Sequence, residues 1–180
     1  MTAAPGGGGA ADTEALPPDL AAALAQVYRP NGFTCSQPQR EAESADYGAY
    51  TFALNGRSIC FRIAKTTPTK VGQFVTLWKR AGQGPIQPFD ASDGVDYFVV
   101  VSRAAERWGQ FVFPRAVLRD RGIVSVNGVG GKRAIRVYPP WVDTGSRQAG
   151  ATQRWQLDFF LELTPGRSTD GERMRQLFGH

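Results

Sequence analysis

A tight β-hairpin centred on Asn55-Gly56 is the feature that most constrains the fold. Apolar side chains alternate with other residues for several positions on both sides of this pair. Asn-Gly suits a two-residue type I′ turn, because both central residues then adopt positive φ angles. Such a turn fixes the register of the two strands, so we expect Tyr50 to lie opposite Phe61.

The same register predicts an acid beside a lysine at the open end of the hairpin. Continued past Phe61, it pairs Gly48 with Ile63 and Asp46 with Lys65. Side chains alternate between the two faces of a strand, so Asp46 and Lys65 are expected on the same face as the phenylalanines.

The remaining pattern predicts an α+β fold. Strands are expected over 73–78, 97–101, 110–113 and 135–138, and helices over 19–29, 115–121 and 149–161. This order favours a mostly antiparallel mixed sheet with a few flanking helices. Residues 1–18 are rich in Ala, Gly and Pro and are expected to form a flexible tail. With 180 residues, the chain then has room for one ordinary domain over 19–180.

Several catalytic classes are excluded by missing residues. The one histidine is His180, so Ser-His-Asp and Cys-His triads and histidine zinc sites have no internal imidazole. Two cysteines, Cys35 and Cys60, are too few for a zinc cluster, and we expect them to be reduced packing residues. No P-loop or dinucleotide-binding glycine motif is present. Carboxylates, lysine, tyrosine and a divalent cation held by oxygen remain as the available chemistry.

The expected location is cytoplasmic. No apolar run approaches the roughly 20 residues that a membrane span needs. The first residues also lack both a basic leader and an apolar segment, so no secretion signal is expected.

The formal net charge of +5 hides an uneven distribution. Residues 1–46 hold six acids against two bases, whereas residues 47–156 hold sixteen bases against six acids. The stretch 47–89 contains no acid at all. Concentrated positive charge attracts phosphate chains through the release of their counterions, so a polyanion is the expected partner. The alternative is a basic protein whose charges are spread over all its faces.

Several long strings resemble the MepB family of small bacterial proteins. They are AKTTPTKVGQFVTLWKR, GPIQPFDASDGVDYF, RVYPPW and ATQRWQ, in the order in which the family has them. The resemblance extends from about Tyr28 to Leu163 and implies a single MepB-like domain. It assigns no catalytic residue, so the site hypotheses below rest on this sequence.

The strand that ends at Lys65 resembles the last part of the PD-(D/E)xK nuclease pattern and extends the fold expectation to a restriction-endonuclease-like architecture. Ile63 stands where that pattern has an acid. In this hypothesis Asp46 and Asp96 bind Mg²⁺, Glu43 or Asp96 replaces the missing acid, and Lys65 polarises the attacking water. The alternative is a surface ion pair between Asp46 and Lys65, with Asp96 in a solvated turn.

A binding surface is expected around the loop that follows Lys65. Hydroxyl groups and ammonium groups lie close together at Thr67, Thr69 and Lys70, which suits phosphate oxygens. The predicted surface is extended by Gln73, Lys79, Arg80, Arg133 and Arg136, with Tyr138, Trp141 and Trp155 to stack on bases and Gln153 to contact base edges. For each aromatic residue, packing in the core is the alternative.

The sequence therefore predicts a nucleic-acid-binding protein, with DNA as the expected partner and a nuclease-like site. Two alternatives stay open. One is a binder of, or an enzyme on, a small molecule bearing a phosphate or carboxylate, and the other is a module for an acidic protein partner. Binding to a phosphate chain depends steeply on salt, whereas a pocket for one anion gives a shallow dependence.

Overall fold

The computed structural model describes residues 15–167 and 169–179. Its helical segments are α1 (Pro18–Ala22), η1 (Ala23–Tyr28), η2 (Arg29–Asn31), η3 (Ala45–Tyr47), η4 (Ala91–Asp93), α2 (Arg115–Asp120), α3 (Arg147–Leu157) and α4 (Gly171–Leu177). Its strands are β1 (Gln39–Arg40), β2 (Tyr50–Leu54), β3 (Arg57–Ile63), β4 (Lys65–Thr66), β5 (Gln73–Thr76), β6 (Trp78–Arg80), β7 (Ile86–Pro88), β8 (Tyr97–Ala104), β9 (Arg107–Pro114), β10 (Ala134–Val137) and β11 (Phe160–Glu162).

The predicted hairpin forms with the expected register. β2 and β3 are antiparallel, and Tyr50 lies opposite Phe61. Asn55 and Gly56 have φ angles of 47° and 77°, as a type I′ turn requires. The Asn55 side chain also accepts a hydrogen bond of 2.7 Å from the backbone N–H of Thr34, which ties the turn to the preceding chain.

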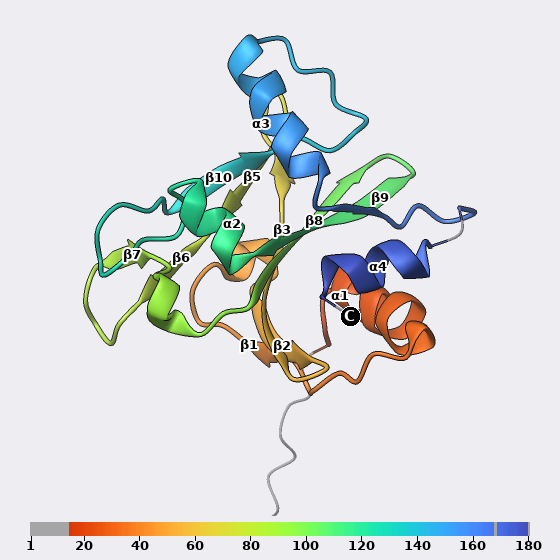
Figure 1. Ribbon diagram of the computed structural model, residues 1–180, viewed down its shortest axis with the longest axis horizontal. Helices are drawn as coiled ribbons and strands as arrows, with labels where there is room; N and C mark the ends of the chain where they lie inside the picture. The colour runs from red at the N-terminus through yellow and green to blue at the C-terminus, as the bar shows by residue number, and fades with distance from the viewer. Residues whose placement is uncertain (1–14, 168, 180) are drawn as a thin grey trace, which may run out of the picture.

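The hairpin belongs to a six-stranded mixed sheet, which confirms the α+β expectation. The strand order is β1-β2-β3-β8-β9-β11. All neighbours are antiparallel except β3 and β8, which run parallel. Two smaller sheets, β10-β5-β4 and β6-β7, stand beside the main sheet (Figure 1).

One face of the main sheet is covered by helices from both ends of the chain. α1, η1 and α4 lie next to each other on this face, although they begin and end the described chain (Figure 1). Buried residues of the helices, including Leu24 and Phe178, pack with Phe61 and Val99 of the sheet in one apolar cluster. The helix expected from residue 19 is confirmed, although its second half has π-helical hydrogen bonding.

The opposite face packs against the smaller sheet and against α2. Phe98 and Phe113 of the main sheet form a second cluster with Val75 of β5, Val137 of β10 and Leu118 of α2. Because β8 is covered on both faces, its sequence begins with a continuous apolar run from Tyr97 to Val101. This second layer carries the residues of the candidate site.

The helix predicted over 149–161 is wrong at its end. α3 stops at Leu157, and Phe160 begins β11, where it pairs with Phe111 of β9. Trp155 and the phenylalanines after it fit a helical stripe, but the exposed edge of β9 offers backbone hydrogen bonds that a longer helix would leave unmade. Tertiary pairing therefore overrides the local pattern.

Two further differences concern the ends of the chain. The predicted tail of residues 1–18 lies mostly outside the described residues, but Leu16 packs against the first cluster and α1 begins at Pro18. α4 was not expected from the sequence. Within the described ranges, none of the helices is both long and apolar enough to cross a membrane.

Candidate functional site

The predicted pair of Asp46 and Lys65 does not form as a cross-strand pair. Gly48 has a φ angle of 55°, which turns the chain before β2 begins at Tyr50. Asp46 consequently lies in the short helix η3, exposed, while Lys65 lies in β4 opposite Phe74 of β5. The extension of the hairpin register past Tyr50 was therefore wrong.

The proposed Mg²⁺ ligands lie at opposite ends of β3. The Asp96 carboxylate accepts a hydrogen bond of 2.8 Å from the backbone N–H of Ser58, at the start of β3. Asp46 precedes β2 at the other end, next to Tyr47, whose ring contacts Lys65. At about 3.3 Å per residue, the length of β3 separates these carboxylates by roughly 20 Å. The predicted Mg²⁺ site of Asp46 and Asp96 is therefore wrong. In the described ranges no three His, Cys, Asp or Glu residues form a group that could hold a metal ion.

Glu43, Lys79 and Arg80 are used in ion pairs on the β6–β7 sheet. Glu43 accepts hydrogen bonds from Arg80 at 2.8 Å and from the Trp78 indole N–H at 3.3 Å, and these bonds hold the pKa of the Glu43 carboxyl below its usual value. Lys79 pairs with Asp93 at 2.5 Å. We call these four charged residues the β6–β7 corner. Lys79 and Arg80, which were expected to extend the binding surface, are thus neutralised by acids within the corner.

Three further predicted contact residues have structural roles instead. Gln73 is buried, and its amide donates to Thr66 and to the Arg103 carbonyl while its carbonyl accepts from Ser102. The Gln153 amide donates to two loop carbonyls at 3.0 and 2.9 Å. Trp141 packs against Phe160 in the second cluster. These side chains are fixed by the protein itself, so they are not positioned to contact bases.

The loop between β4 and β5 is held by Arg136. Its guanidinium group donates to Thr67 Oγ1 at 2.7 Å and to the carbonyls of Val71 and Gly72 at 3.3 and 3.4 Å. Gly72 is needed here, because a Cβ atom in its place would lie 2.7 Å from the ring of Tyr138. Thr69 and Lys70 are exposed on the same loop. Of the predicted loop residues, Thr67 is therefore used to fix the loop, and Lys70 is presented by it.

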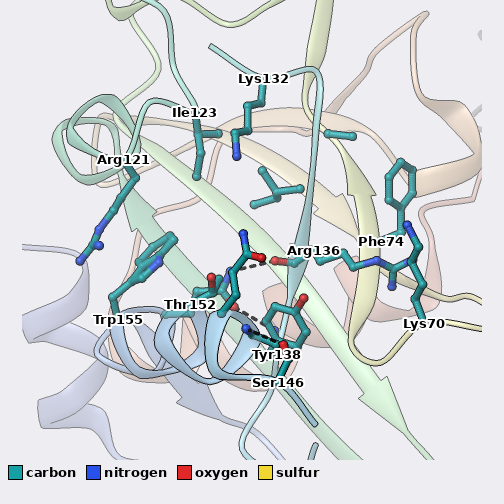
Figure 2. Close-up of a pocket in the computed structure, with 15 residues that line it drawn as sticks. Lys70, Phe74, Arg121, Ile123, Lys132, Arg136, Tyr138, Ser146, Thr152 and Trp155 are labelled. Atoms are coloured by element: carbon teal, nitrogen blue, oxygen red, sulfur yellow. Dashed lines mark hydrogen bonds between the residues drawn. The ribbon is translucent and has the colours of Figure 1, made fainter. Parts of the chain in front are cut away.

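A basic hollow lies between the loop, β10 and α3 (Figure 2). Its volume is about 630 Å³, and its charged lining residues are Lys70, Arg121, Lys132 and Arg136. No acid lines it, and in the part of the chain that the structure describes none of these four cations pairs with a carboxylate. We call this feature the basic hollow.

Two aromatic residues predicted to stack, Tyr138 and Trp155, also line the basic hollow. Gln156, a buried residue of α3, connects this helix to the end of β10. Its side chain accepts a hydrogen bond from the Tyr138 backbone N–H and donates one to the Arg136 carbonyl, both at 2.9 Å. Trp155 leans on Phe113 of the core, with ring centroids 5.4 Å apart. The floor of the hollow is thus a firmly packed part of the protein.

Arg121 covers Trp155 without an acidic partner. Three arginines lie over tryptophans at 4.7 to 5.0 Å from the ring centroid. Two of these arginines, Arg103 and Arg107, also bind the carboxylates of Asp19 and Glu162, whereas Arg121 binds none within the described chain. The charge of the Arg121–Trp155 pair therefore remains available to a ligand.

Cations and aromatic rings continue from the basic hollow to Lys65. The Lys65 ammonium lies 4.7 Å from the centroid of the Tyr47 ring, and Tyr47 contacts Phe74 with centroids 6.0 Å apart. Phe74 lines the hollow and lies beneath the Arg136 guanidinium at 6.0 Å. We call Lys65, Tyr47 and Phe74 the Lys65 ridge, which brings one predicted residue to the margin of the hollow.

Arg121 and Lys132 were missed by the sequence analysis, and Arg133 was placed differently. Arg121 directly follows α2 as its C-cap residue, and Lys132 is held by its backbone N–H, which donates to the Ile123 carbonyl at 2.8 Å. Arg133 is exposed but does not line the hollow. A signal was present, because residues 121–142 contain four bases and no acid, like the stretch 47–89.

Comparison with known proteins identifies the family. The chain is similar to the protein in the crystal structure of MepB, with 35% sequence identity and a TM-score of 0.69 over 74% of this chain and 89% of that one. A search of curated proteins finds no match. The MepB-like family model matches residues 41–162, which include the Lys65 ridge and all the cations of the basic hollow. The chain therefore belongs to the MepB-like family.

Proposed function

We propose that this protein binds nucleic acid, with DNA as its partner, through the basic hollow and the Lys65 ridge. The observation that carries the proposal is the difference between basic side chains that are paired with acids and those that are not. Within the described residues, six of the sixteen bases of the central region pair with acids, whereas the four in the basic hollow do not and lie together beside Trp155 and Tyr138. Unpaired cations with aromatic rings between them are the usual surface for a phosphate backbone and its bases.

A chain of phosphates is favoured over one anion because the cations extend beyond the hollow. A single phosphate or carboxylate is bound within one pocket and gains little from a distant ammonium group in water. Lys65 lies outside the hollow lining, yet Tyr47 and Phe74 connect it to the margin. DNA is kept as the proposed partner, as expected from the sequence, and the comparison with RNA in the salt experiment below tests it.

No cutting step is included in this proposal. The two carboxylates expected to bind Mg²⁺ for cutting, Asp46 and Asp96, are separated by the length of β3, and Glu43 is engaged by Arg80. Lys65 is retained as a phosphate contact, because its ammonium is exposed and packs on a ring rather than on an acid.

A second candidate function is the binding of a small anionic molecule such as a free nucleotide. The size of the basic hollow favours it, because about 630 Å³ is typical of pockets that enclose small ligands. In this case only the cations of the hollow take part, and Lys65 makes no contribution.

The salt dependence of binding tests the proposed function. Fluorescence anisotropy with labelled 20-mers, both single-stranded and duplex, is measured from about 50 to 200 mM salt. Each neutralised phosphate contributes about 0.7 to 0.9 to the slope of log K against log salt, so four contacts give a slope of about −2.8 for the single strand and about −3.6 for the duplex. A slope near −1, or no binding at about 50 mM salt, contradicts the proposal. An RNA of the same sequence that binds more tightly contradicts its DNA part.

A further inference from the structure

We infer that the basic hollow receives one unpaired nucleotide of a DNA strand, while the rest of the strand follows the Lys65 ridge. This inference rests on the proposed function and names the form of DNA that the site selects. A single strand, or a duplex with one unpaired nucleotide, is then bound more tightly than a continuous duplex.

The dimensions of the basic hollow support this form of DNA. Pockets of about 300 to 1,000 Å³ surround most of the surface of a small molecule, and this hollow has about 630 Å³. A continuous duplex keeps its bases paired and stacked inside the helix, so it presents mainly phosphates to such a hollow. An unpaired nucleotide can leave the stack and place its base inside.

The walls of the hollow suit a base as well as a phosphate. In the view of Figure 2, Arg121 lies on one side of Trp155 and the rest of the hollow on the other. The Trp155 ring is held on its two supports, Arg121 and Phe113, at centroid distances of 4.9 and 5.4 Å. A base that stacks here meets an already ordered ring, which lowers the entropic cost of binding.

Unused polar groups near Trp155 can contact the edge of a base. Gln148 and Thr152 line the hollow from α3, and within the described chain neither side chain has a hydrogen-bond partner. By contrast, Gln153 and Gln156 on the same helix are engaged by loop and strand backbone. The helix therefore presents its unengaged groups toward the hollow.

The phosphates of the same nucleotide and its neighbour lie toward Lys70 and Arg136. Lys70 is presented by the loop that Arg136 holds, and both residues line the side of the hollow away from Trp155 (Figure 2). From there the Lys65 ridge leads out of the hollow. This order of base site, phosphate site and outer cation matches a strand that enters the hollow and leaves along β4.

The experiment uses DNA that contains one 2-aminopurine, a fluorescent base whose emission falls when it stacks. Three 20-mers of the same sequence are compared: a single strand, a continuous duplex, and a duplex in which the 2-aminopurine is an unpaired extra nucleotide. Because stacking on an aromatic side chain contributes about 1 to 3 kcal/mol per base, we expect the first and third to bind roughly tenfold more tightly than the second. Their emission is expected to change on binding, whereas that of the duplex is not.

Two variants locate the effect. Thr152→Phe adds a ring inside the hollow from a half-buried helix position, and it should remove the tenfold preference and the change in emission. Ala151→Phe adds the same ring at the next, exposed position, which does not line the hollow, and should change neither. Thr152 belongs to neither apolar cluster, and urea unfolding of both variants checks that the fold is retained.

The outcomes separate the inference from the proposed function. Equal affinity for the three DNAs, with no change in emission, overturns the inference and leaves DNA binding in place. No binding of any of them at about 50 mM salt overturns the proposed function. If free 2-aminopurine deoxynucleoside monophosphate binds as tightly as the single strand, no strand is needed, and the small-molecule function replaces both.

Discussion

The basic hollow and the β6–β7 corner are built from similar residues but carry different charge. Each contains lysine and arginine close to tryptophan. In the corner, Glu43 and Asp93 pair with Arg80 and Lys79 at 2.8 and 2.5 Å. In the hollow, no acid is present, and its cations have no carboxylate partner within the described chain. Residues of similar type thus form ion pairs that hold the fold together in the corner, and a candidate binding surface in the hollow.

The difference shows that local basicity is a poor measure of available charge. Arg62 is the extreme case, since it lies in the acid-free stretch 47–89 but is fully buried and paired with Glu41 at 2.7 Å. A buried guanidinium without this carboxylate would be costly, so the pair serves the fold. Whether the charge of a basic side chain is available to a ligand depends on the acids that lie near it in the folded protein. The lining of the hollow contains no acid.

The largest expected effect separates the two regions directly. The double variant Arg121→Gln/Lys132→Gln should weaken single-stranded DNA binding by roughly a hundredfold at low salt, because each lost charged contact is worth about 1.5 kcal/mol or more. The slope of log K against log salt should become shallower by about 1.4, because each phosphate contact of a single strand contributes about 0.7. Fluorescence anisotropy at several salt concentrations measures both quantities.

The matched control is the double variant Lys79→Gln/Arg80→Gln in the β6–β7 corner. It removes the same formal charge, but those charges are already neutralised by Glu43 and Asp93. DNA affinity should change by less than about threefold, since only long-range attraction is altered and salt screens it. If both double variants weaken binding equally, the distinction between hollow and corner is incorrect.

A smaller effect is expected from Arg136, which acts through the loop it holds. Arg136→Lys retains the charge but cannot donate at once to Thr67, Val71 and Gly72, so Lys70 should lose its fixed position. We expect binding about fivefold weaker. In a double-mutant cycle with Lys70→Ala the losses should not add, because both variants remove the same phosphate contact.

Additive losses in that cycle would show that the Arg136 guanidinium makes a contact of its own that a lysine at this position does not replace. Thr67→Val provides a second check, since it removes only the hydroxyl group that accepts from Arg136. It should reproduce part of the loss while the free energy of unfolding, measured with urea, stays nearly constant.

The Lys65 ridge should give a still smaller effect. Lys65→Ala is expected to weaken binding about threefold, as is usual for one exposed phosphate contact at moderate salt. Arg57 is the matched control, because it is an exposed cation at the turn end of the β2–β3 hairpin, opposite Leu54. Arg57→Ala should have no measurable effect, and equal losses for the two would mean that only diffuse charge attracts DNA.

Local sequence signals predicted the parts of the fold that depend on neighbouring residues. The Asn55-Gly56 turn and its register follow from two residues with positive φ angles and from alternation on either side. The strand that begins at Tyr97 follows from its apolar run. The same reasoning failed beyond Tyr50, because the left-handed conformation at Gly48 that ends the pairing has no distinctive local pattern.

The candidate site was only partly predictable because its properties depend on contacts between distant residues. Lys70, Arg136, Tyr138 and Trp155 were expected from residue type, and they do meet in one hollow. The pairing of Arg80 with Glu43 joins residues 37 positions apart, so nothing near either residue announces it. The local sequence could therefore not predict which basic side chains are neutralised by an acid and which remain available to a ligand.

The last prediction concerns Asp90, which shows what the acids near the corner do for the hollow. Its carboxylate accepts hydrogen bonds from the Gly128 N–H at 2.9 Å, from Ser92 and from the Ser125 hydroxyl at 2.7 Å, and these hold its pKa far below the usual value. Asp90 thereby anchors the loop that leads to Lys132. A carboxyl whose pKa is lowered by folding contributes stability at pH values above its unfolded pKa near 3.8, and this contribution is lost as the pH falls below about 4.

Asp90→Asn should therefore lower the free energy of unfolding in urea at pH 7, and the gap to the parent protein should narrow at pH 3, where the unfolded chain takes up the proton. DNA affinity at pH 7 should fall less than threefold, because Lys132 also keeps its backbone bond to Ile123. A gap that is the same at both pH values would show that the ionised carboxylate is not what stabilises this loop. A large loss of affinity would instead mean that the acids outside the hollow determine its shape, so that the two regions act as one.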